Sequence, residues 1–281
     1  MLMGKGKLPR IKRYRIGQQE IVQADCLRVL RRMSPHSVDV VVTSPPYNIG
    51  LPYRRYPDCK TEEEYLNWMF SIAHQIRRVI KPKGSFFFNI SGSSSQPWLP
   101  FELVVRLRSL FVLQNHIVWV KSISIGEESF GHFKPLNSQR YLHHGHEHIF
   151  HLTCDGSVPL NRLEIGVPYK DKSNIVRRGH KRDRRCRGNT WFIPYPTVQK
   201  RSEKFDHPGL FPVALPEHCI RLHRPEGECE NLQVLDPFMG TGTTLLAAQS
   251  LGCRGIGIEI DEDYVSVARK RLREIILTQT V

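Results

Sequence analysis

The sequence predicts an α/β fold built on a mostly parallel sheet, and two observations lead to this prediction. Short apolar runs of strand type alternate with segments whose apolar residues recur at helical spacing, the pattern of parallel strands joined by helical crossovers. The length of 281 residues allows one large core with an insertion, or at most two modest domains. No internal repeat is visible, so a repeat architecture is not expected.

The expected elements follow one another in a regular order. Strands are predicted at 21–23, 38–43, 85–90, 116–120, 147–152, 233–235 and 255–259, with further order at 191–195, and helices at 27–33, 61–80, 100–110, 215–223, 244–250 and 263–276. Thr61 and Glu64 have the spacing of a capping box, which predicts where the second helix begins. The strands at 116–120 and 147–152 are expected to pair as an antiparallel edge.

The charge of the chain indicates a polyanionic partner. It has 41 Lys and Arg residues against 27 Asp and Glu residues, which gives a formal net charge of +14. Nucleic acid is favoured over an anionic membrane surface because the charge clusters between Lys170 and Arg187, where nine basic residues accompany two acids. A solvated, unstructured charge run is the alternative interpretation of that segment.

The remaining composition is typical of an intracellular protein. The seven cysteines show no CxxC pair and no repeated spacing, so we expect them to be reduced and structural. No signal peptide is predicted, because residues 1–15 lack its apolar run. No membrane span is predicted, because no apolar run approaches the roughly 20 residues needed. Residues 1–15 are rich in Lys and Arg and offer little to bury, so we expect a mobile basic arm over residues 1–19.

The stretch from Leu235 to Thr244 has the pattern of a strand that ends in a glycine turn and continues as a helix. Gly240 and Gly242 lack side chains and tolerate positive φ, so the backbone of this turn can approach a ligand closely. The turn has neither the GxGxxG of a dinucleotide site nor the lysine of a P-loop, so we do not expect a phosphate there. Glu259 ends the next strand, where an acid in a Rossmann-like fold accepts hydrogen bonds from ribose. A favourable charge at the following helix N-terminus is the alternative role of Glu259.

A second turn, Thr43-Ser44-Pro45-Pro46-Tyr47, follows the apolar strand at 38–43. Together with the glycine turn and Glu259, it resembles the beta group of S-adenosylmethionine-dependent DNA amino-methyltransferases, in which a catalytic half precedes the cofactor half. The resemblance extends from about Gln23 to Arg273. It implies a Rossmann-like methyltransferase fold with a mostly parallel seven-stranded sheet, an antiparallel edge strand and a basic inserted recognition segment.

The resemblance also implies how the chain is divided and which residues hold the cofactor, S-adenosyl-L-methionine. The catalytic half would occupy residues 20–154, the target recognition segment 155–190, and the cofactor-binding half of the same domain 191–281. The implied cofactor-binding residues are Asp25, Asp236, Pro237, Phe238, Gly240, Thr241, Gly242, Thr243, Glu259 and Ile260. Asp236, Phe238, Gly240 and Gly242 would border the methionine end, and Glu259 would hold the ribose.

Two assignments near the cofactor have further interpretations. Asp25 would approach the adenine amino group, and a helix N-cap is a second role that is compatible with the first. Residues 206–212 resemble the family's segment that closes over the cofactor, although Phe211-Pro212 stands where a Lys-Pro is common.

The catalytic residues implied by the resemblance are Ser44, Pro45, Pro46 and Tyr47. The lone pair of an exocyclic amine is delocalised into the base, and two acceptors on the amine hydrogens would localise it as the methyl group arrives. Because prolines fix φ and lack an N–H, the carbonyl of Pro45 can serve as one acceptor, and the hydroxyl of Ser44 as the other. Tyr47 would stack on a base rotated out of the duplex. This chemistry requires no metal, and none is predicted.

The base is expected to be cytosine. In the family, serine at the position of Ser44 mostly accompanies cytosine, and aspartate mostly accompanies adenine. We therefore expect a site-specific methyltransferase that acts on the 4-amino group of cytosine in double-stranded DNA. The alternatives are the 6-amino group of adenine, an RNA methyltransferase, and a catalytically silent DNA-binding module; a broken catalytic turn would signal the last of these.

The expected partners follow from this activity. They are double-stranded DNA and, where the enzyme protects DNA, a cognate restriction endonuclease that acts on the same site without a stable complex. No membrane partner is expected. The protein is expected to be a cytoplasmic monomer or homodimer that associates with the nucleoid when bound to DNA.

DNA contacts are expected from the basic run, through base edges or phosphates. The residues concerned are Arg177, Arg178, Lys181, Arg182, Arg184, Arg185 and Arg187.

Several other patterns have a structural interpretation as well. Trp119-Val120-Lys121, His146-Glu147-His148 and Asn189-Thr190-Trp191 resemble strand signatures of the family, with ordinary packing as the alternative. A cluster of five histidines invites a zinc interpretation, but it lacks a cysteine pair, and the alternation of His146 and His148 places these two on one face of a strand. The cluster is His143, His144, His146, His148 and His151. Cys186 lies among arginines but has no supporting base, so we expect it to be structural.

Overall fold

The computed structural model describes residues 10–53, 55–133, 136–177, 182–195, 211–223 and 231–279. Its strands are β1 (Lys12–Ile16), β2 (Gln19–Gln23), β3 (Val38–Thr43), β4 (Ile80–Ile90), β5 (Val112–Val120), β6 (Ser122–Ile125), β7 (Glu128–Gly131), β8 (His146–Thr153), β9 (Thr190–Phe192), β10 (Gln233–Asp236) and β11 (Arg254–Glu259). Its helices are α1 (Cys26–Leu30), α2 (Glu62–Val79), α3 (Leu99–Leu107), α4 (Ser173–Arg177), α5 (Ala214–His223), α6 (Thr243–Ser250) and α7 (Glu262–Gln279).

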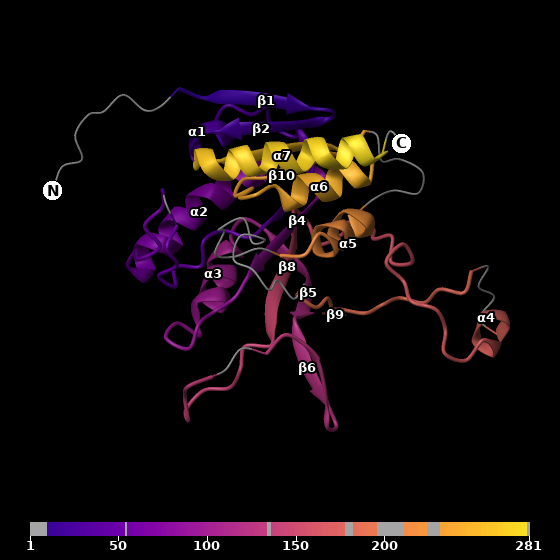
Figure 1. Ribbon diagram of the computed structural model, residues 1–281. Coiled ribbons are helices and arrows are strands. Elements are labelled where there is room, and N and C mark those ends of the chain that lie inside the picture. Colours follow the sequence, from indigo (N-terminus) through magenta and orange to yellow (C-terminus); the bar gives the residue numbers. More distant parts are fainter. Residues whose placement is uncertain are drawn as a thin grey trace.

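Within the described residues, nine strands form one sheet in the order β1-β2-β11-β10-β3-β4-β8-β5-β9 (Figure 1). Neighbouring strands from β2 to β4 are parallel, whereas β8 runs antiparallel to both β4 and β5. The mostly parallel α/β sheet expected from the sequence is therefore confirmed. The seven predicted strands form the continuous stretch from β2 to β5, and β1 and β9 extend that stretch at its two edges.

The antiparallel strand lies in a different place from the one expected. β5 and β8 pair as predicted, but β8 lies inside the sheet between β4 and β5, so the expectation of an edge position was wrong. Residues 149–153 of β8 are all buried. Burial of consecutive residues is typical of a strand that is covered on both faces, which explains the interior position.

Helices cover both faces of the sheet because side chains alternate along the strands. In β4, Phe86 and Phe88 pack into a core with residues of α1, α2 and α3. Phe87, between them, belongs to a second core that includes residues of α5 and α6. The result is a three-layer arrangement in which the sheet is the middle layer.

Helix α2 begins and ends for reasons that are visible in the sequence. The hydroxyl of Thr61 accepts the backbone N–H of Glu64 at 3.3 Å, and the Glu64 carboxylate accepts the N–H of Thr61 at 3.0 Å, so the predicted capping box is confirmed. The helix ends at Val79, three residues before Pro82, which lacks the N–H needed to continue a helix.

The N-terminal arm expected over residues 1–19 was wrong for residues 12–16, while residues 1–9 lie outside the described part of the chain. Residues 12–16 form β1, which pairs antiparallel with β2. Ile16 is buried, and the guanidinium of Arg269 lies 4.2 Å from the ring centroid of Tyr14. Ion pairs hold the basic side chains, Lys12 with Glu262 and Arg13 with Glu20. The strand was not predicted because acids elsewhere in the fold compensate its charge.

Two further features were not predicted. β6 and β7 form an antiparallel hairpin that extends from the body of the molecule (Figure 1). α4 lies within the expected recognition segment 155–190, at the end of an excursion of the chain away from the sheet (Figure 1). No helix in the described part of the chain is long and apolar enough to cross a membrane.

Candidate active site

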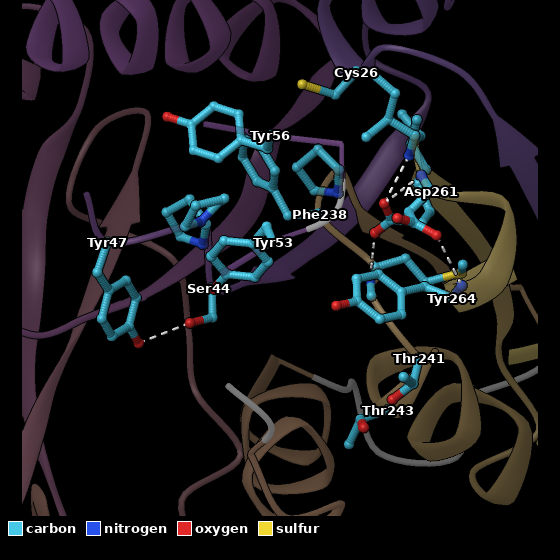
Figure 2. A pocket seen from close by; sticks show the side chains of 18 of the residues that line it. Cys26, Ser44, Tyr47, Tyr53, Tyr56, Phe238, Thr241, Thr243, Asp261 and Tyr264 are labelled. Atoms are coloured by element: carbon cyan, nitrogen blue, oxygen red, sulfur yellow. Dashed lines mark hydrogen bonds between the residues drawn. The ribbon is translucent and has the colours of Figure 1, made fainter. Parts of the chain in front are cut away.

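A pocket at the carboxyl ends of the parallel strands brings together two turns that are far apart in the sequence (Figure 2). One part of its wall is the turn 44–47 after β3, and another is the turn 237–241 after β10. β3 and β10 are neighbours in the sheet, with Val41 opposite Leu235. The turns that follow two parallel neighbours lie at the same edge of the sheet, which is where ligands bind in open α/β folds.

A buried carboxylate connects the two turns from behind. Asp236 accepts hydrogen bonds from the hydroxyls of Thr43 at 2.6 Å and Thr244 at 2.7 Å, and from the backbone N–H of Phe238 at 3.0 Å. Burial raises the pKa of Asp236 to about 6, against these hydrogen bonds, which lower it. Asp236 is not among the residues that line the pocket and lies behind the turn, and its expected place beside the cofactor stays a prediction.

The two glycines of the turn have different surroundings. Gly240 has a φ of +53° and lines the pocket together with Pro237, Phe238, Thr241 and Thr243. Gly242 has a φ of +87°, and a Cβ at this position would lie 2.9 Å from the Cβ of Ala268. It is outside the pocket wall. Gly242 is therefore required by the backbone conformation and by the packing of α7, and its expected place at the cofactor stays a prediction.

Arg271 of α7 supports the turn from the protein side. Its Nη1 atom donates to the carbonyl oxygen of Thr241 at 2.8 Å and lies within 2.9 and 3.2 Å of the hydroxyls of Thr241 and Thr243. Burial lowers the pKa of Arg271. The guanidinium thus holds two residues of the pocket wall in place.

Glu259 lines the pocket at the end of β11. Its Oε1 accepts the backbone N–H groups of Ile260 and Asp261, both at 2.8 Å, and its Oε2 accepts the N–H of Gly240 at 2.9 Å. A carboxylate has about four acceptor positions, so one position remains on Oε2. Burial raises the pKa of Glu259 to about 7, although the three N–H donors lower it. Ile260 also lines the pocket.

Asp25 belongs to the same pocket and also caps α1. Its side chain accepts the backbone N–H of Arg28 at 2.9 Å, so the N-cap role is present. The wall near it is aromatic: the rings of Tyr56 and Trp68 stack with centroids 5.1 Å apart, and Phe238 packs edge-on against Trp68. A flat, apolar wall beside a polar acceptor suits an aromatic ring that carries hydrogen-bond donors.

The turn at 44–47 is anchored by its second proline. The hydroxyl of Tyr65, on α2, donates to the carbonyl oxygen of Pro46 at 2.7 Å. Among the residues that the structure describes, none donates a hydrogen bond to the carbonyl oxygen of Pro45. Pro45 lines the pocket, so its carbonyl is available as an acceptor.

The side chains of this turn belong to a buried polar network. The oxygens of Ser44 and Tyr47 are 2.7 Å apart (Figure 2), and the hydroxyl of Tyr47 donates to Oε2 of Glu147 at 2.8 Å. The amide nitrogen of Asn89 lies 2.7 Å from the Tyr47 oxygen and 2.8 Å from the same carboxylate oxygen. Lys121 forms an ion pair with the other oxygen of Glu147 at 3.1 Å. The network joins the ends of β3, β4, β5 and β8.

The electrostatics of this network keep Tyr47 neutral. Burial raises the pKa of Tyr47 well above its usual range, and the carboxylate of Glu147 raises it further. Lys121 and Glu147 have side chains that are only 19% and 9% exposed, so the two charges compensate one another away from bulk water.

Sequence reasoning missed several residues of the pocket wall. Asn89, Tyr195 and Asp261 were not predicted, and Glu147 was noted only within a strand signature. The same is true of Lys121, its ion-pair partner, which does not line the pocket. Asn89 lies near the end of β4, and Asp261 follows β11, both at the edge of the sheet that carries the site. This position at the strand ends is the feature of the sequence that could have indicated them. Glu147 has no such signal because it lies near the start of an antiparallel strand.

The basic residues expected to contact DNA fall into three groups. Arg178 and Lys181 lie outside the described residues. Arg184 and Arg187 donate to the backbone carbonyls of Gly166 at 2.9 Å and Ile165 at 2.8 Å, so both stabilise the fold of the segment itself. The remaining three are exposed and have local partners: Arg177 with Asn174, Arg182 with Glu164, and Arg185 with the carbonyl of Cys186.

The other sequence patterns have simple structural outcomes. His146 and His148 lie on one face of β8, with ring centroids 5.3 Å apart. Among the described residues, no three His, Cys, Asp or Glu side chains are placed to hold a metal ion. Cys186 is exposed. Of the segment 206–212, residues 206–210 lie outside the described part, and Phe211 lines the pocket.

Comparison with known proteins identifies the family. The model of the N6_N4_Mtase family, described as DNA methylase, matches residues 38–270. The chain therefore belongs to this family of DNA methylases. Curated relatives include the Type II methyltransferase M.ScaI of Streptomyces caespitosus, which is 29% identical over 273 residues, covering 92% of this chain and 83% of the relative. Another is the DNA adenine methyltransferase YhdJ of Escherichia coli, which is 26% identical over 261 residues, covering 90% and 82%.

Solved structures support the same fold. The PvuII DNA methyltransferase, whose name specifies cytosine N4, superposes with a TM-score of 0.68 at 20% identity, covering 92% of this chain and 87% of that one. A putative DNA modification methylase of Thermus thermophilus, solved with S-adenosyl-L-methionine, gives 0.58 at 24% identity, covering 90% and 93%. The chain is an S-adenosyl-L-methionine-dependent DNA methyltransferase, and the fold and cofactor predicted from the sequence are confirmed.

The pocket contains acceptors that fit this cofactor. One acceptor position of Glu259 remains open. Oδ2 of Asp261 is buried and has no hydrogen-bond partner among the described residues, while Asp261 lines the pocket. An unpaired buried acceptor is costly unless a ligand pairs with it. The hydroxyl and amino groups of S-adenosyl-L-methionine are donors that could satisfy these positions.

Proposed function

We propose that this enzyme methylates the 4-amino group of cytosine at a specific site in double-stranded DNA, with the target base rotated out of the helix. The observation that carries the choice of base is Ser44, a neutral side chain at the first position of the turn 44–47. The structural neighbour named as cytosine-N4-specific supports this choice. The relative named as an adenine methyltransferase favours the second candidate, the 6-amino group of adenine.

The proposed chemistry uses two acceptors on the target amine. The carbonyl oxygen of Pro45 and the hydroxyl oxygen of Ser44 would each accept one amine hydrogen, drawing the nitrogen toward tetrahedral geometry and localising its lone pair. When bound, S-adenosyl-L-methionine supplies an electrophilic methyl group. The residues of the protein bind, orient and exclude water, so positioning accounts for most of the rate.

The cofactor would be held by residues that follow β10 and β11, together with Asp25 and Trp68. The open acceptor position of Glu259 would take a ribose hydroxyl. Asp25 would approach the adenine amino group, and Phe238 with Trp68 would form an apolar wall. The turn residues Pro237, Gly240, Thr241 and Thr243 would border the remainder of the cofactor.

DNA would be bound by the exposed basic side chains of the segment 155–190. Arg177, Arg182 and Arg185 are exposed, and their contacts would be with phosphates or base edges. A restriction endonuclease acting on the same site would be the functional partner if the enzyme protects DNA.

The base is tested by identifying the product. Purified protein is incubated with S-adenosyl-L-methionine and unmethylated genomic DNA, which is then digested to nucleosides for mass spectrometry. We expect 4-methylcytosine. If the product is 6-methyladenine, the methyltransferase activity stands and the assignment of cytosine is overturned. If RNA is the preferred substrate in a parallel reaction, the assignment of DNA as the substrate is overturned.

A further inference from the structure

Ser44 raises a chemical question that its position alone does not answer. A serine hydroxyl has one hydrogen to donate and two lone pairs to accept with, so it can face an amine in either sense. To activate the target amine it must accept. The polar network around Ser44 determines which sense it takes.

The direction of each hydrogen bond in the network follows from the carboxylate of Glu147. Glu147 has a carboxylate that can only accept, so Tyr47, at 2.8 Å, donates its single hydrogen to it. Tyr47 then has no hydrogen left for Ser44, whose oxygen is 2.7 Å away. Ser44 must therefore donate to Tyr47.

The neighbouring amide gives the same polarity. The nitrogen of Asn89 donates toward the Tyr47 oxygen at 2.7 Å, which leaves that oxygen accepting from both Asn89 and Ser44. The contact from Asn89 to Ser44 is longer, at 3.3 Å. The hydrogen of Ser44 is thus engaged inside the protein, and lone-pair density remains on the side of its oxygen that faces the pocket.

We propose that Glu147, acting through Tyr47, holds Ser44 as an acceptor for the target amine and takes up the proton that the amine releases after methyl transfer. Glu147 is then a positioning residue in the first role and the terminal base of a three-member relay in the second. The inference rests on the proposed role of Ser44, but it applies equally to cytosine and to adenine.

The relay balances atoms and charge. The nitrogen lone pair forms the C–N bond while the C–S bond of the sulfonium breaks and its electrons stay on sulfur, which leaves the nitrogen positively charged. The amine proton passes to the oxygen of Ser44, the Ser44 proton passes to Tyr47, and the Tyr47 proton passes to Oε2 of Glu147. One sulfonium and one carboxylate are consumed, and one thioether and one carboxylic acid are formed.

The surroundings of Glu147 suit this task. Its side chain is 9% exposed, and Lys121, at 3.1 Å, compensates its charge before transfer. The other titratable groups close enough to interact with its charge are Tyr195, and His146 and His148, which flank it on β8 and project from the opposite face of the strand. Burial lowers the pKa of His148 to about 4 and also lowers that of His146, so neither histidine is a competing cation at neutral pH.

The first test compares Glu147→Gln and Tyr47→Phe with the wild type in single-turnover methyl transfer at saturating cofactor. Both variants keep the size of the side chain and remove the relay, and we expect each rate to fall by about 10²-fold or more. Binding of S-adenosyl-L-methionine, followed by calorimetry, should change little and confirms that the variants are folded. Glu63→Gln, which removes an exposed carboxylate paired with Arg106, is the matched control and should retain the wild-type rate.

The second test separates the relay from simple support of the turn. In the Ser44→Asp variant the carboxylate can accept from the amine without orientation by Tyr47 and Glu147. Glu147→Gln should therefore lower the rate of methyl transfer far less in the Ser44→Asp variant than in the wild type.

The inference is overturned if Glu147→Gln reacts within about twofold of the wild type, or if Glu147→Gln lowers the rate by the same factor in the wild-type and Ser44→Asp backgrounds. The identity of the methylated nucleoside is measured on the wild type alone. A failure of the base assignment is therefore distinguishable from a failure of the relay.

Discussion

The two halves of the pocket are stabilised in different ways. In the cofactor half, Glu259 is held by N–H groups of its own loop and of the glycine turn. In the catalytic half, Ser44 and Tyr47 are held by side chains that are 45 and 100 residues away in the sequence. Backbone amides fix a carboxylate with little freedom, whereas a side-chain network has a polarity that one protonation event can change. The first arrangement suits binding, and the second suits proton transfer.

Among the variants that test this difference between the two halves, Ser44→Ala should have the largest effect on the rate of methyl transfer. Loss of one of two acceptors at the reacting amine should lower the single-turnover rate by about 10²–10³-fold. Affinity for S-adenosyl-L-methionine should stay near the wild-type value, because the cofactor half is held independently. Rapid-quench kinetics and calorimetry measure the two quantities, and parallel losses in both would contradict the separation of the halves.

Glu259→Gln should give the opposite result. A hydrogen bond to a charged group contributes about 1.5–3 kcal/mol. Its loss should raise the dissociation constant for the cofactor roughly 10–100-fold. The rate at saturating cofactor should change much less, because the interaction is made equally in the ground and transition states. Calorimetric titration with S-adenosyl-L-methionine provides the test, and an unchanged affinity would remove Glu259 from the ribose site.

The pH dependence of cofactor binding tests the same carboxylate without a mutation. Burial raises the pKa of Glu259 to about 7. Below that pH a proton occupies the acceptor position on Oε2, so affinity for S-adenosyl-L-methionine should fall as the pH drops from 8 to 6, and Glu259→Gln should flatten the profile. The same raised pKa means that the cofactor-free folded state binds a proton more readily than the unfolded chain does. Its stability should therefore decline as the pH rises from about 5 toward 7.

The smallest expected effect concerns Gly242, which the structure places behind the pocket. Gly242→Ala should destabilise the fold by about 1–3 kcal/mol, because its φ is positive and its new Cβ would lie 2.9 Å from that of Ala268. Gly252→Ala is the matched control, since Gly252 also has a positive φ but open space around it. Thermal unfolding should show the larger loss for Gly242→Ala, and equal losses would leave backbone conformation as the sole requirement at both positions.

Local sequence patterns were sufficient to predict most of the helices and strands. The capping box at Thr61, the apolar run of β3 and the spacing of the strand, turn and helix around Gly240 depend on residues within a few positions of one another. The order of the two turns along the chain was enough to recognise the family. β1 was not predicted, because its basic side chains have acidic partners that are distant in the sequence, such as Glu262 for Lys12.

Only the tertiary structure decided the composition of the site. Val41 and Leu235 meet because β3 and β10 are neighbours in the sheet, and no local signal specifies that pairing. The same contact places Asp236 behind the turn, where it binds Thr43, and not in the pocket. Glu147 reaches Tyr47 because β8 is inserted between β4 and β5. Hydrogen bonds between side chains depend on distances of about 3 Å, and such distances follow from sheet order and packing rather than from the spacing of residues along a chain.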